Sequence, residues 1–241
     1  MSNKKIIIGS GLAGPLLAIL LAQRGYYVDL FEKRADLRLE SVSAGRSINL
    51  ALSHRGIEAL KSASIFEMVE PLLLPMKGRM IHQKNSELDF QPYSMNAEEY
   101  INSVSRSELN KILITAAEDT GKVNIHFSHA LSSIQDNQLE FENSHKVEIE
   151  NEIIGADGSG SVVRKYIDSN CDLPSITKPL GHAYKELTIA PGKNGDFQID
   201  ANSLHIWPRG QFMLIGLPNT DRSFTCTLFM PNEGDVSFES L

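Results

Sequence analysis

The 241-residue sequence predicts an α/β fold in which a parallel-sheet domain precedes a mostly antiparallel β-sheet domain. Two observations favour this fold class. Strand-like and helix-like stretches alternate along the first 177 residues. From about residue 180, four strand-like stretches are separated by Pro, Gly, Asn and Asp turns and lack helical periodicity. We therefore expect one domain over residues 1–177, with an excursion toward the second around 71–100, and a partial sheet domain over 178–241.

The first element is an apolar stretch at residues 4–25, "KKIIIGSGLAGPLLAILLAQRG", which is open to two interpretations. It could be an export signal or membrane anchor, or a buried strand and helix joined by a turn. A spanning helix needs about 20 apolar residues without helix breakers. Here Gly9, Gly11 and Gly14 form G-x-G-x-x-G between strand-like "KKIII" and helix-like "PLLAILLAQR". The stretch therefore favours a strand, a turn and a helix.

Each glycine of this motif has a mechanical role. The first makes a tight turn, the second lets the backbone approach a pyrophosphate, and the third lets the helix pack on the strand. The phosphates would lie at the helix N-terminus. The next strand, "YYVDLFEKR", ends at Glu32, 18 residues beyond Gly14, where an acid can accept hydrogen bonds from an adenosine ribose. We predict a dinucleotide site, and this single unit leaves FAD and NAD as alternatives.

The following elements are read from periodicity and turn residues. Residues 53–73 predict a helix opened by Ser53 and ending near Pro71. Residues 105–121 predict a second helix with apolar positions at i, i+3, i+4 and i+7. Then "VNIHFS", "NQLEFEN" and "KVEIENEIIGAD" alternate as strands, and "GADGSGSVVRKYI" turns into a helix. The four late strands are "HAYKELTIA", "SLHIWP", "FMLIGLP" and "FTCTLFMP".

Composition excludes several function classes. The net charge is −7 and the basic residues are scattered along the sequence, so no basic cluster indicates binding to nucleic acid. Cys171 and Cys226 form no CxxC pair, so we expect a reduced, cytoplasmic chain without a signal peptide or transmembrane helix. Positions three apart in an alternating strand point to opposite faces of a sheet. The rings of His126 and His129 should therefore diverge, and we predict no metal site.

Further stretches carry a resemblance to a known family. They are "GRSINLALSHRG" at 45–56, "GRMIH" at 78–82 with "PY" at 92–93, "YINSVSRSELNKILITAAE" at 100–118, "GADGSGSVVR" at 155–164, and the strand region at 204–231. Together with the N-terminal unit, they resemble the FAD-dependent aromatic hydroxylases, and most specifically the branch that acts on L-kynurenine. The similarity extends over nearly the whole chain.

The resemblance implies a monooxygenase that uses FAD as cofactor, NADPH and O2 as co-substrates, and converts L-kynurenine to 3-hydroxykynurenine. In such enzymes the cofactor carries the chemistry, so no catalytic acid, base or nucleophile is expected from the chain. Two alternatives stay open. One is a related flavin hydroxylase acting on another aromatic acid. The other is an inactive dinucleotide-binding fragment.

Site residues follow from the motifs and the resemblance. Asp157 and its glycine turn would shape the backbone near the pyrophosphate, with Arg164 holding that geometry. Arg79 and Tyr93 correspond to the residues that bind the substrate carboxylate. The candidate FAD contacts are Gly9, Gly11, Ala13, Gly14, Phe31, Glu32, Lys33, Arg34, Arg46, Ala51, Arg106, Leu131 and Asp157.

After residue 180 the chain departs from the family pattern: its Gly-Asp pairs stand at 195–196 and 234–235, and we expect neither to be the second Gly-Asp motif of FAD-binding members. We therefore expect the resemblance to cover roughly the N-terminal half of such an enzyme. Membrane association stays undecided, and we allow for a homodimer.

Overall fold

The computed structural model describes residues 3–39, 48–96, 98–150, 152–171 and 175–241. The chain divides into two compact units, each assembled from three stretches. The first unit comprises Met1–Ser41, Ala59–Met68 and Leu109–Thr177, and the second comprises Val42–Glu58, Val69–Glu108 and Lys178–Leu241. Among the described residues, none of the helices combines the length and the apolar character needed to cross a membrane.

The first unit is built on a parallel four-stranded sheet in the order β12-β1-β2-β8. Its strands are β1 (Lys4–Ile8), β2 (Tyr27–Phe31), β8 (Val123–His126) and β12 (Ile153–Gly155). Parallel strands covered on both faces need mostly apolar sequence, which the three isoleucines of "KKIII" and the apolar residues of "YVDLF" supply. The predicted strand, turn, helix and strand at the N-terminus are confirmed.

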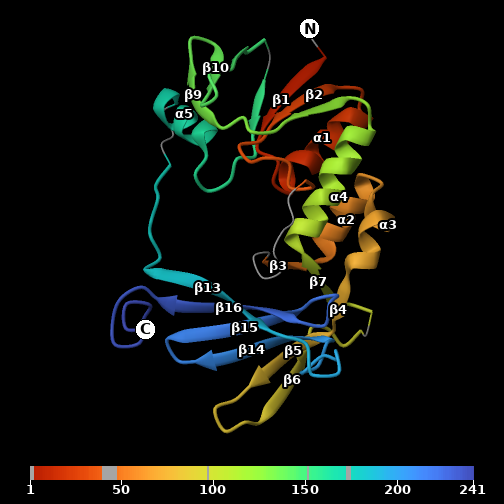
Figure 1. The fold of residues 1–241 in the computed structure, drawn as a ribbon, viewed down its shortest axis with the longest axis vertical. Coiled ribbons are helices and arrows are strands. Elements are labelled where there is room, and N and C mark those ends of the chain that lie inside the picture. Colours follow the sequence, from red (N-terminus) through yellow and green to blue (C-terminus); the bar gives the residue numbers. More distant parts are fainter. Residues whose placement is uncertain (1–2, 40–47, 97, 151, 172–174) are drawn as a thin grey trace. The chain divides into compact units, whose positions relative to one another are not determined.

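Both faces of this sheet are covered (Figure 1). Helix α1 (Ala13–Gln23) packs on one face and buries Ala18, Ile19 and Ala22 there. Figure 1 shows α4 (Arg106–Asp119), the predicted second helix, on the same side. The opposite face carries the antiparallel strands β9 (Leu131–Gln135), β10 (Gln138–Phe141) and β11 (Lys146–Glu148) and helix α5 (Val162–Asn170). The core there contains Ile6, Ile8, Phe31, Ile134, Leu139, Phe141 and Val163.

The helix predicted over residues 53–73 is not continuous, so that prediction is wrong in part. The chain forms α2 (His54–Ser62), α3 (Phe66–Val69) and a 3-10 turn, η1 (Glu70–Leu72). Between α2 and α3, Ser64 adopts a left-handed φ of +58°, and the Ile65 amide donates to the Leu60 carbonyl. The break buries both Ala63 and Ile65, a tertiary gain that helix periodicity does not reveal.

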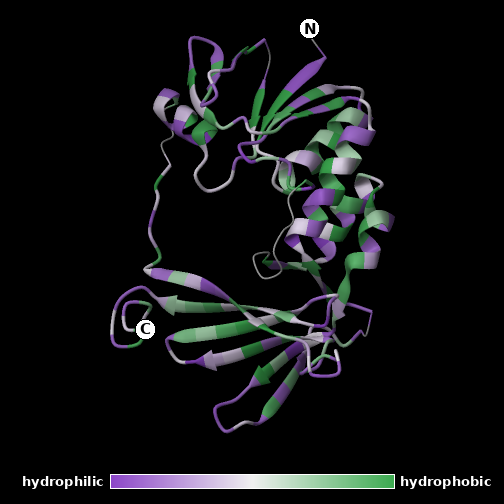
Figure 2. Ribbon diagram, in the orientation of Figure 1, coloured by the Kyte–Doolittle hydropathy of each residue, from purple (hydrophilic) through white to green (hydrophobic). Residues whose placement is uncertain are grey.

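The second unit contains a six-stranded sheet in the order β13-β16-β15-β14-β5-β6. The predicted late strands are confirmed as β13 (His182–Ile189), β14 (Ser203–Arg209), β15 (Phe212–Pro218) and β16 (Phe224–Pro231). Strands β5 (Gly78–His82) and β6 (Leu88–Pro92) extend this sheet, and only the β5–β14 pairing within it is parallel. Figure 2 shows hydrophobic residues along β15 and β16 and along the central strands of the first unit.

A smaller antiparallel sheet, β3-β7-β4, completes the second unit. It comprises β3 (Asn49–Leu52), β7 (Ile101–Ser105) and β4 (Leu74–Met76). Asn49 is buried, and its Nδ2 donates to Ser103 Oγ at 3.0 Å, to the Pro218 carbonyl at 2.9 Å and to Asn219 Oδ1 at 2.6 Å. One buried amide therefore ties this sheet to the end of β15.

We predict that Asn49→Ala lowers the free energy of unfolding of the second unit by about 1 to 3 kcal/mol, because buried acceptors lose their donor. Urea unfolding followed by the fluorescence of Trp207 measures this, since Trp207 is the single tryptophan and lies in β14. The exposed Asn232, changed to Ala, is the control. Equal losses in both variants would contradict the prediction.

Candidate functional site

The glycine turn follows β1 directly, and two of its glycines are required by the chain itself. Gly9 has φ +104°, and a Cβ there would lie 2.4 Å from the Ala156 carbonyl oxygen. A Cβ on Gly14 would lie 2.0 Å from the Gly9 carbonyl oxygen. Helix α1 therefore packs directly on the turn, and the turn packs directly on the segment that leads to Asp157.

Gly11 differs from these two glycines. A Cβ at Gly11 would meet no described atom within 4 Å, so the chain does not need a glycine there for its own packing. The space beside Gly11 adjoins the N-terminus of α1, whose N-cap, Leu12, makes no side-chain capping bond. An open turn at a helix N-terminus is the geometry in which backbone amides bind a phosphate.

Glu32 lies just after β2 and is only 5% exposed. Its Oε2 accepts a hydrogen bond from the Ser10 amide at 2.7 Å, and its Oε1 accepts from the amide and the Nε of Arg34 at 3.0 and 2.7 Å. Burial alone would raise the pKa of Glu32, but the bonds from Arg34 and Ser10 outweigh burial and hold the pKa below its ordinary value. The carboxylate is therefore charged at neutral pH and fixed against the turn.

Ser10 is a candidate site residue that sequence reasoning missed. Its side chain is fully buried, and its Oγ has no hydrogen-bond partner within the described part of the chain. Buried hydroxyls are normally paired, so this one points to a missing polar partner. The x positions of G-x-G-x-x-G carry no pattern that would have singled it out. The orphaned hydroxyl, the open turn at Gly11 and the buried acid together fit a bound dinucleotide.

The segment after Glu32 is held by backbone and side-chain bonds. The His129 amide donates to the Glu32 carbonyl at 2.8 Å, and the Ser128 amide donates to the Arg34 carbonyl at 2.9 Å. Farther along, Arg38 pairs with Asp36 at 2.7 Å and with Glu118 of α4 at 2.6 Å. Hydrogen bonds to Asp36 and then to Glu118 raise the pKa of Arg38. Lys33 and Arg34 belong to the segment that these bonds hold in place, and both residues are exposed.

Phe31 and Leu131, two of the expected FAD contacts, have side chains that pack in the core. The Phe31 ring stacks on Phe141 at 4.7 Å and on His126 at 4.5 Å. Leu131 packs against the same core cluster. The Phe31 carbonyl accepts the Gly9 amide at 2.8 Å. Phe31 therefore acts on the turn through its backbone, whereas Ala13 is exposed at the start of α1.

Asp157 uses its carboxylate to cap α5. Its Oδ2 accepts the amides of Val162 and Val163 at 2.8 and 3.3 Å, and Arg164 Nη2 donates to the Ser159 carbonyl at 2.8 Å. Carboxylates stabilise helix N-termini in this way. The Asp-Gly turn is thereby fixed next to the first glycine of the N-terminal motif, although the two lie far apart in the sequence.

The remaining predicted residues belong to the second unit, apart from Arg46, which lies outside the described residues. Ala51 of β3 pairs with Ser103 of β7, and the Arg106 amide donates to the Ile48 carbonyl at 3.2 Å. Arg106 therefore lies beside the start of β3, whereas Ala51 lies farther along the same strand. The Arg106 side chain is exposed.

Arg79 and Tyr93, the expected substrate residues, are in contact. The Arg79 Cζ lies 5.1 Å from the centre of the Tyr93 ring. The Tyr93 hydroxyl is buried, and among the described residues it finds no polar partner other than the adjacent Arg79 guanidinium. Burial raises the pKa of the Tyr93 phenol, and the nearby Arg79 cation offsets this only in part. A guanidinium and a hydroxyl side by side can both donate hydrogen bonds to a carboxylate.

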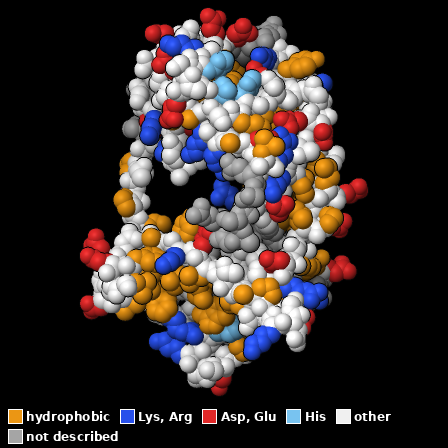
Figure 3. All heavy atoms as spheres, in the orientation of Figure 1, with side chains coloured by type: hydrophobic (Ala, Val, Ile, Leu, Met, Phe, Trp, Pro, Cys, Tyr) orange, Lys and Arg blue, Asp and Glu red, His pale blue; other side chains and the backbone are white. Residues whose placement is uncertain are grey.

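Apolar side chains share the sheet face of Arg79, and sequence reasoning did not assign them a role. The strand register places Leu204 opposite Arg79, and alternate positions of β14, β15 and β16 follow on that face. Figure 3 shows hydrophobic side chains gathered over the six-stranded sheet. The residues on the face of Arg79 include Ile81, Leu204, Ile206, Met213, Ile215, Leu217 and Phe229. The uninterrupted apolar run "FMLIGLP" is the signal that could have found them, because successive strand residues point to opposite faces and both faces are then apolar.

The expectation that His126 and His129 diverge is wrong, because their ring centroids lie 5.7 Å apart. Strand β8 ends at His126, and Ser128 has a φ of +57°, so the alternation of the strand is broken before His129. Within the described ranges, no group of three or more His, Cys, Asp or Glu side chains is arranged to hold a metal ion.

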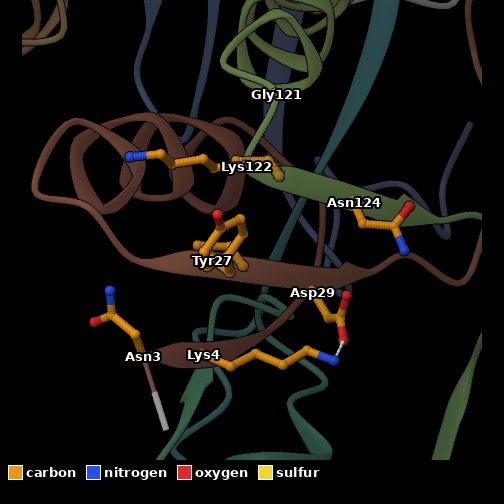
Figure 4. A pocket seen from close by; sticks show the side chains of 9 residues that line it. Asn3, Lys4, Tyr27, Asp29, Gly121, Lys122 and Asn124 are labelled. Carbon is orange, nitrogen blue, oxygen red and sulfur yellow. Dashed lines mark ion pairs between the residues drawn. The ribbon is translucent and has the colours of Figure 1, made fainter.

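A shallow depression lies at the other end of the parallel sheet, where β1, β2 and β8 begin (Figure 4). Tyr27, Lys122 and Asn124 line it, together with the ion pair of Lys4 and Asp29 at 2.6 Å. Ligands of open parallel sheets bind at the carboxyl ends of the strands, so this depression is not the nucleotide site.

The parallel sheet, the glycine turn and the buried acid define a dinucleotide-binding protein of the Rossmann type. Residues 3–182 match the family model described as an FAD binding domain. The chain belongs to this family of FAD-binding proteins.

Curated relatives are similar over nearly the whole chain. Kynurenine 3-monooxygenase of Myxococcus xanthus is 46% identical over 241 residues, covering 98% of this chain and 52% of that protein. The enzymes of the same name from Legionella pneumophila and Dictyostelium discoideum are 43% and 46% identical, with 98% and 99% of this chain and 53% and 52% of theirs covered. The chain thus spans about half the length of these relatives.

Solved structures share the fold. A 2-methyl-3-hydroxypyridine-5-carboxylic acid oxygenase matches with a TM-score of 0.76 at 20% identity, over 95% of this chain and 58% of that one. HpxO of Klebsiella pneumoniae, solved with FAD, matches with a TM-score of 0.74 at 15% identity, over 95% of this chain and 57% of that one. At these identities the likeness concerns the fold alone.

We predict opposite outcomes for two glycine substitutions in the turn. Gly11→Ala should leave the stability of the FAD-free chain within about 0.5 kcal/mol. It should weaken FAD binding at least about tenfold, because the methyl group would fill the space in which we predict the phosphates to lie. Gly14→Ala should destabilise the fold by about 1 to 3 kcal/mol, because its Cβ collides with Gly9.

Thermal unfolding without FAD and a flavin fluorescence titration separate the two effects. A stable Gly11→Ala chain that binds FAD as tightly as the parent chain would contradict the placement of the phosphates.

Proposed function

We propose that this chain forms the FAD-binding part and part of the substrate-binding sheet of a monooxygenase. The enzyme consumes NADPH and O2 and hydroxylates L-kynurenine to 3-hydroxykynurenine. The observation that carries the proposal is the contact of the Arg79 guanidinium with Tyr93, whose hydroxyl is buried, beside an apolar sheet face. The relatives at 43% to 46% identity that are named kynurenine 3-monooxygenase support it.

The proposed site divides the substrate into a charged end and an aromatic end. Kynurenine is an amino acid whose side chain is an aminophenyl ketone. Arg79 would hold its carboxylate with a charge-assisted contact, and the Tyr93 hydroxyl would donate a second hydrogen bond. The binding of this carboxylate would give the proton of the buried hydroxyl an acceptor, which Arg79 cannot be because a guanidinium only donates.

The aromatic ring would lie on the apolar face that continues from Arg79 across the sheet. Met213 is 37% exposed there, and neighbouring Ile215 and Phe229 are partly exposed. Partly exposed aliphatic and aromatic side chains bind a ring through burial of its apolar surface, and they exclude water from it. The described residues of this face thus offer a surface that suits an aromatic amino acid.

In the first unit, the turn around Gly11 would hold the pyrophosphate of FAD, and Glu32 would face its adenosine ribose. FAD, when bound, would supply the redox chemistry that couples oxidation of NADPH to oxygenation of the aromatic ring by O2. The chain's own task is to bind, to orient and to exclude water.

The proposed function is tested on the protein in its longest natural form, loaded with FAD. Addition of L-kynurenine should accelerate NADPH consumption and yield 3-hydroxykynurenine, identified by mass. An FAD-loaded protein whose NADPH consumption is unchanged by kynurenine, but rises with another aromatic acid, would replace kynurenine with that substrate.

We predict that Arg79→Met raises the KM for kynurenine about 10- to 100-fold without loss of bound FAD, because a charge-assisted bond to the carboxylate is removed. Tyr93→Phe should give a smaller rise, since one neutral hydrogen bond is lost. Arg222→Met is the control, because Arg222 is an exposed arginine of the same unit, paired with Asp196. Loss of FAD in Arg79→Met, or a KM that matches the control, would argue against Arg79 as the carboxylate ligand.

A further inference from the structure

Asn110 occupies a position of α4 where the periodicity calls for an apolar residue. It shares the buried face of the helix with Leu113, Ile114 and Ala117, at i+3, i+4 and i+7, and is only 6% exposed. Asparagine is a poor helix former, and burying an unpaired amide is costly. An asparagine at this position therefore needs hydrogen bonds that a leucine could not make.

Those bonds reach the glycine turn. Asn110 Nδ2 donates to the carbonyl oxygens of Ser10 and Gly11, both at 3.1 Å. The contact joins residues 100 and 99 positions apart in the chain. One amide group thus fixes the direction of two consecutive carbonyls in the middle of G-x-G-x-x-G.

The direction of a carbonyl fixes the direction of the next amide. In a planar trans peptide the C=O and the N–H point to opposite sides. With the carbonyls of Ser10 and Gly11 turned toward α4, the amides of Gly11 and Leu12 are turned away from that helix. The preceding peptide is held by Glu32, which accepts the Ser10 amide at 2.7 Å. Two buried side chains therefore orient three successive peptide planes of the turn.

We propose that Asn110 is a positioning residue for the dinucleotide, holding the turn so that its Gly11 and Leu12 amides point to the pyrophosphate. The inference rests on FAD binding at this turn. Asn110 acts through the backbone and not by touching the cofactor. Leucine, with the same branching at Cγ, would fit the apolar stripe but would leave both carbonyls without a donor. Aspartate would place a carboxylate against the two carbonyl oxygens.

The first test measures amide hydrogen exchange in the FAD-free chain. The reporter is the Ser10 amide, which is bonded to Glu32, and the reference is the Leu30 amide in the central strand β2. In Asn110→Leu and Asn110→Asp, exchange at Ser10 should accelerate about tenfold or more while Leu30 is unchanged, because only the turn is loosened. Equal acceleration at both amides, or none at Ser10, would overturn the positioning role.

The second test measures FAD affinity by flavin fluorescence. Asn110→Leu should weaken binding about tenfold or more at every pH. In Asn110→Asp, burial and the two carbonyl dipoles raise the pKa of the new carboxyl, so its neutral form is favoured. The neutral form can donate to one carbonyl. FAD affinity of this variant should therefore recover as the pH falls from about 8 to about 5, whereas that of Asn110→Leu should not.

Asn137→Asp is the matched control, because the Asn137 amide also donates to a distant backbone carbonyl, that of Ile149, but at an exposed position. Unchanged FAD affinity in both Asn110 variants, or the same pH response in all three, would refute the inference. A parent chain that takes up no FAD would instead count against FAD binding by this chain alone. In that case exchange at Ser10 still decides whether Asn110 holds the turn.

Discussion

The first unit, which contains the glycine turn, depends on one buried contact, the hydrogen bond from the Ser10 amide to the carboxylate of Glu32. This contact joins the end of β1 to the end of β2, and the backbone of Glu32 continues the connection to β8 through His126 and His129. A buried carboxylate is tolerated only when its oxygens are satisfied. The turn, the following segment and Arg34 must therefore all lie where they can donate to it, which leaves the glycine turn little freedom.

In the second unit, the six-stranded sheet carries the Arg79 cation among apolar side chains. Successive side chains of a strand point to opposite faces of the sheet. One face therefore carries Arg79 with aliphatic and aromatic residues, and the other buries His205 and Phe224. The buried Asn49 amide then fixes β3 and β7 to the end of β15. The strands that lead to Ala51 and Arg106 are thereby held to the same sheet as Arg79.

Local patterns predicted the strand, turn, helix and strand at the N-terminus, the helix α4 and the four late strands. A glycine motif, helical periodicity and strand patterns each depend only on residues that are neighbours in the sequence. Features set by distant partners were missed. Strands β3 and β5 pair with segments far along the chain, and the break at Ser64 follows from the burial of Ala63 and Ile65. The orphaned hydroxyl of Ser10 has no sequence signal, since only the fold decides which hydroxyls are left unpaired.

The interleaving of the two units has a consequence for how the chain folds during synthesis. The parallel sheet has all its strands once β12 has left the ribosome, with the segments of the second unit looped out between them. Strands β5 and β6 are made early, but their partner β14 follows more than a hundred residues later. At ordinary translation rates that wait is on the order of ten seconds. During that time the nascent hairpin carries an unpaired edge, which makes it a natural target for chaperones.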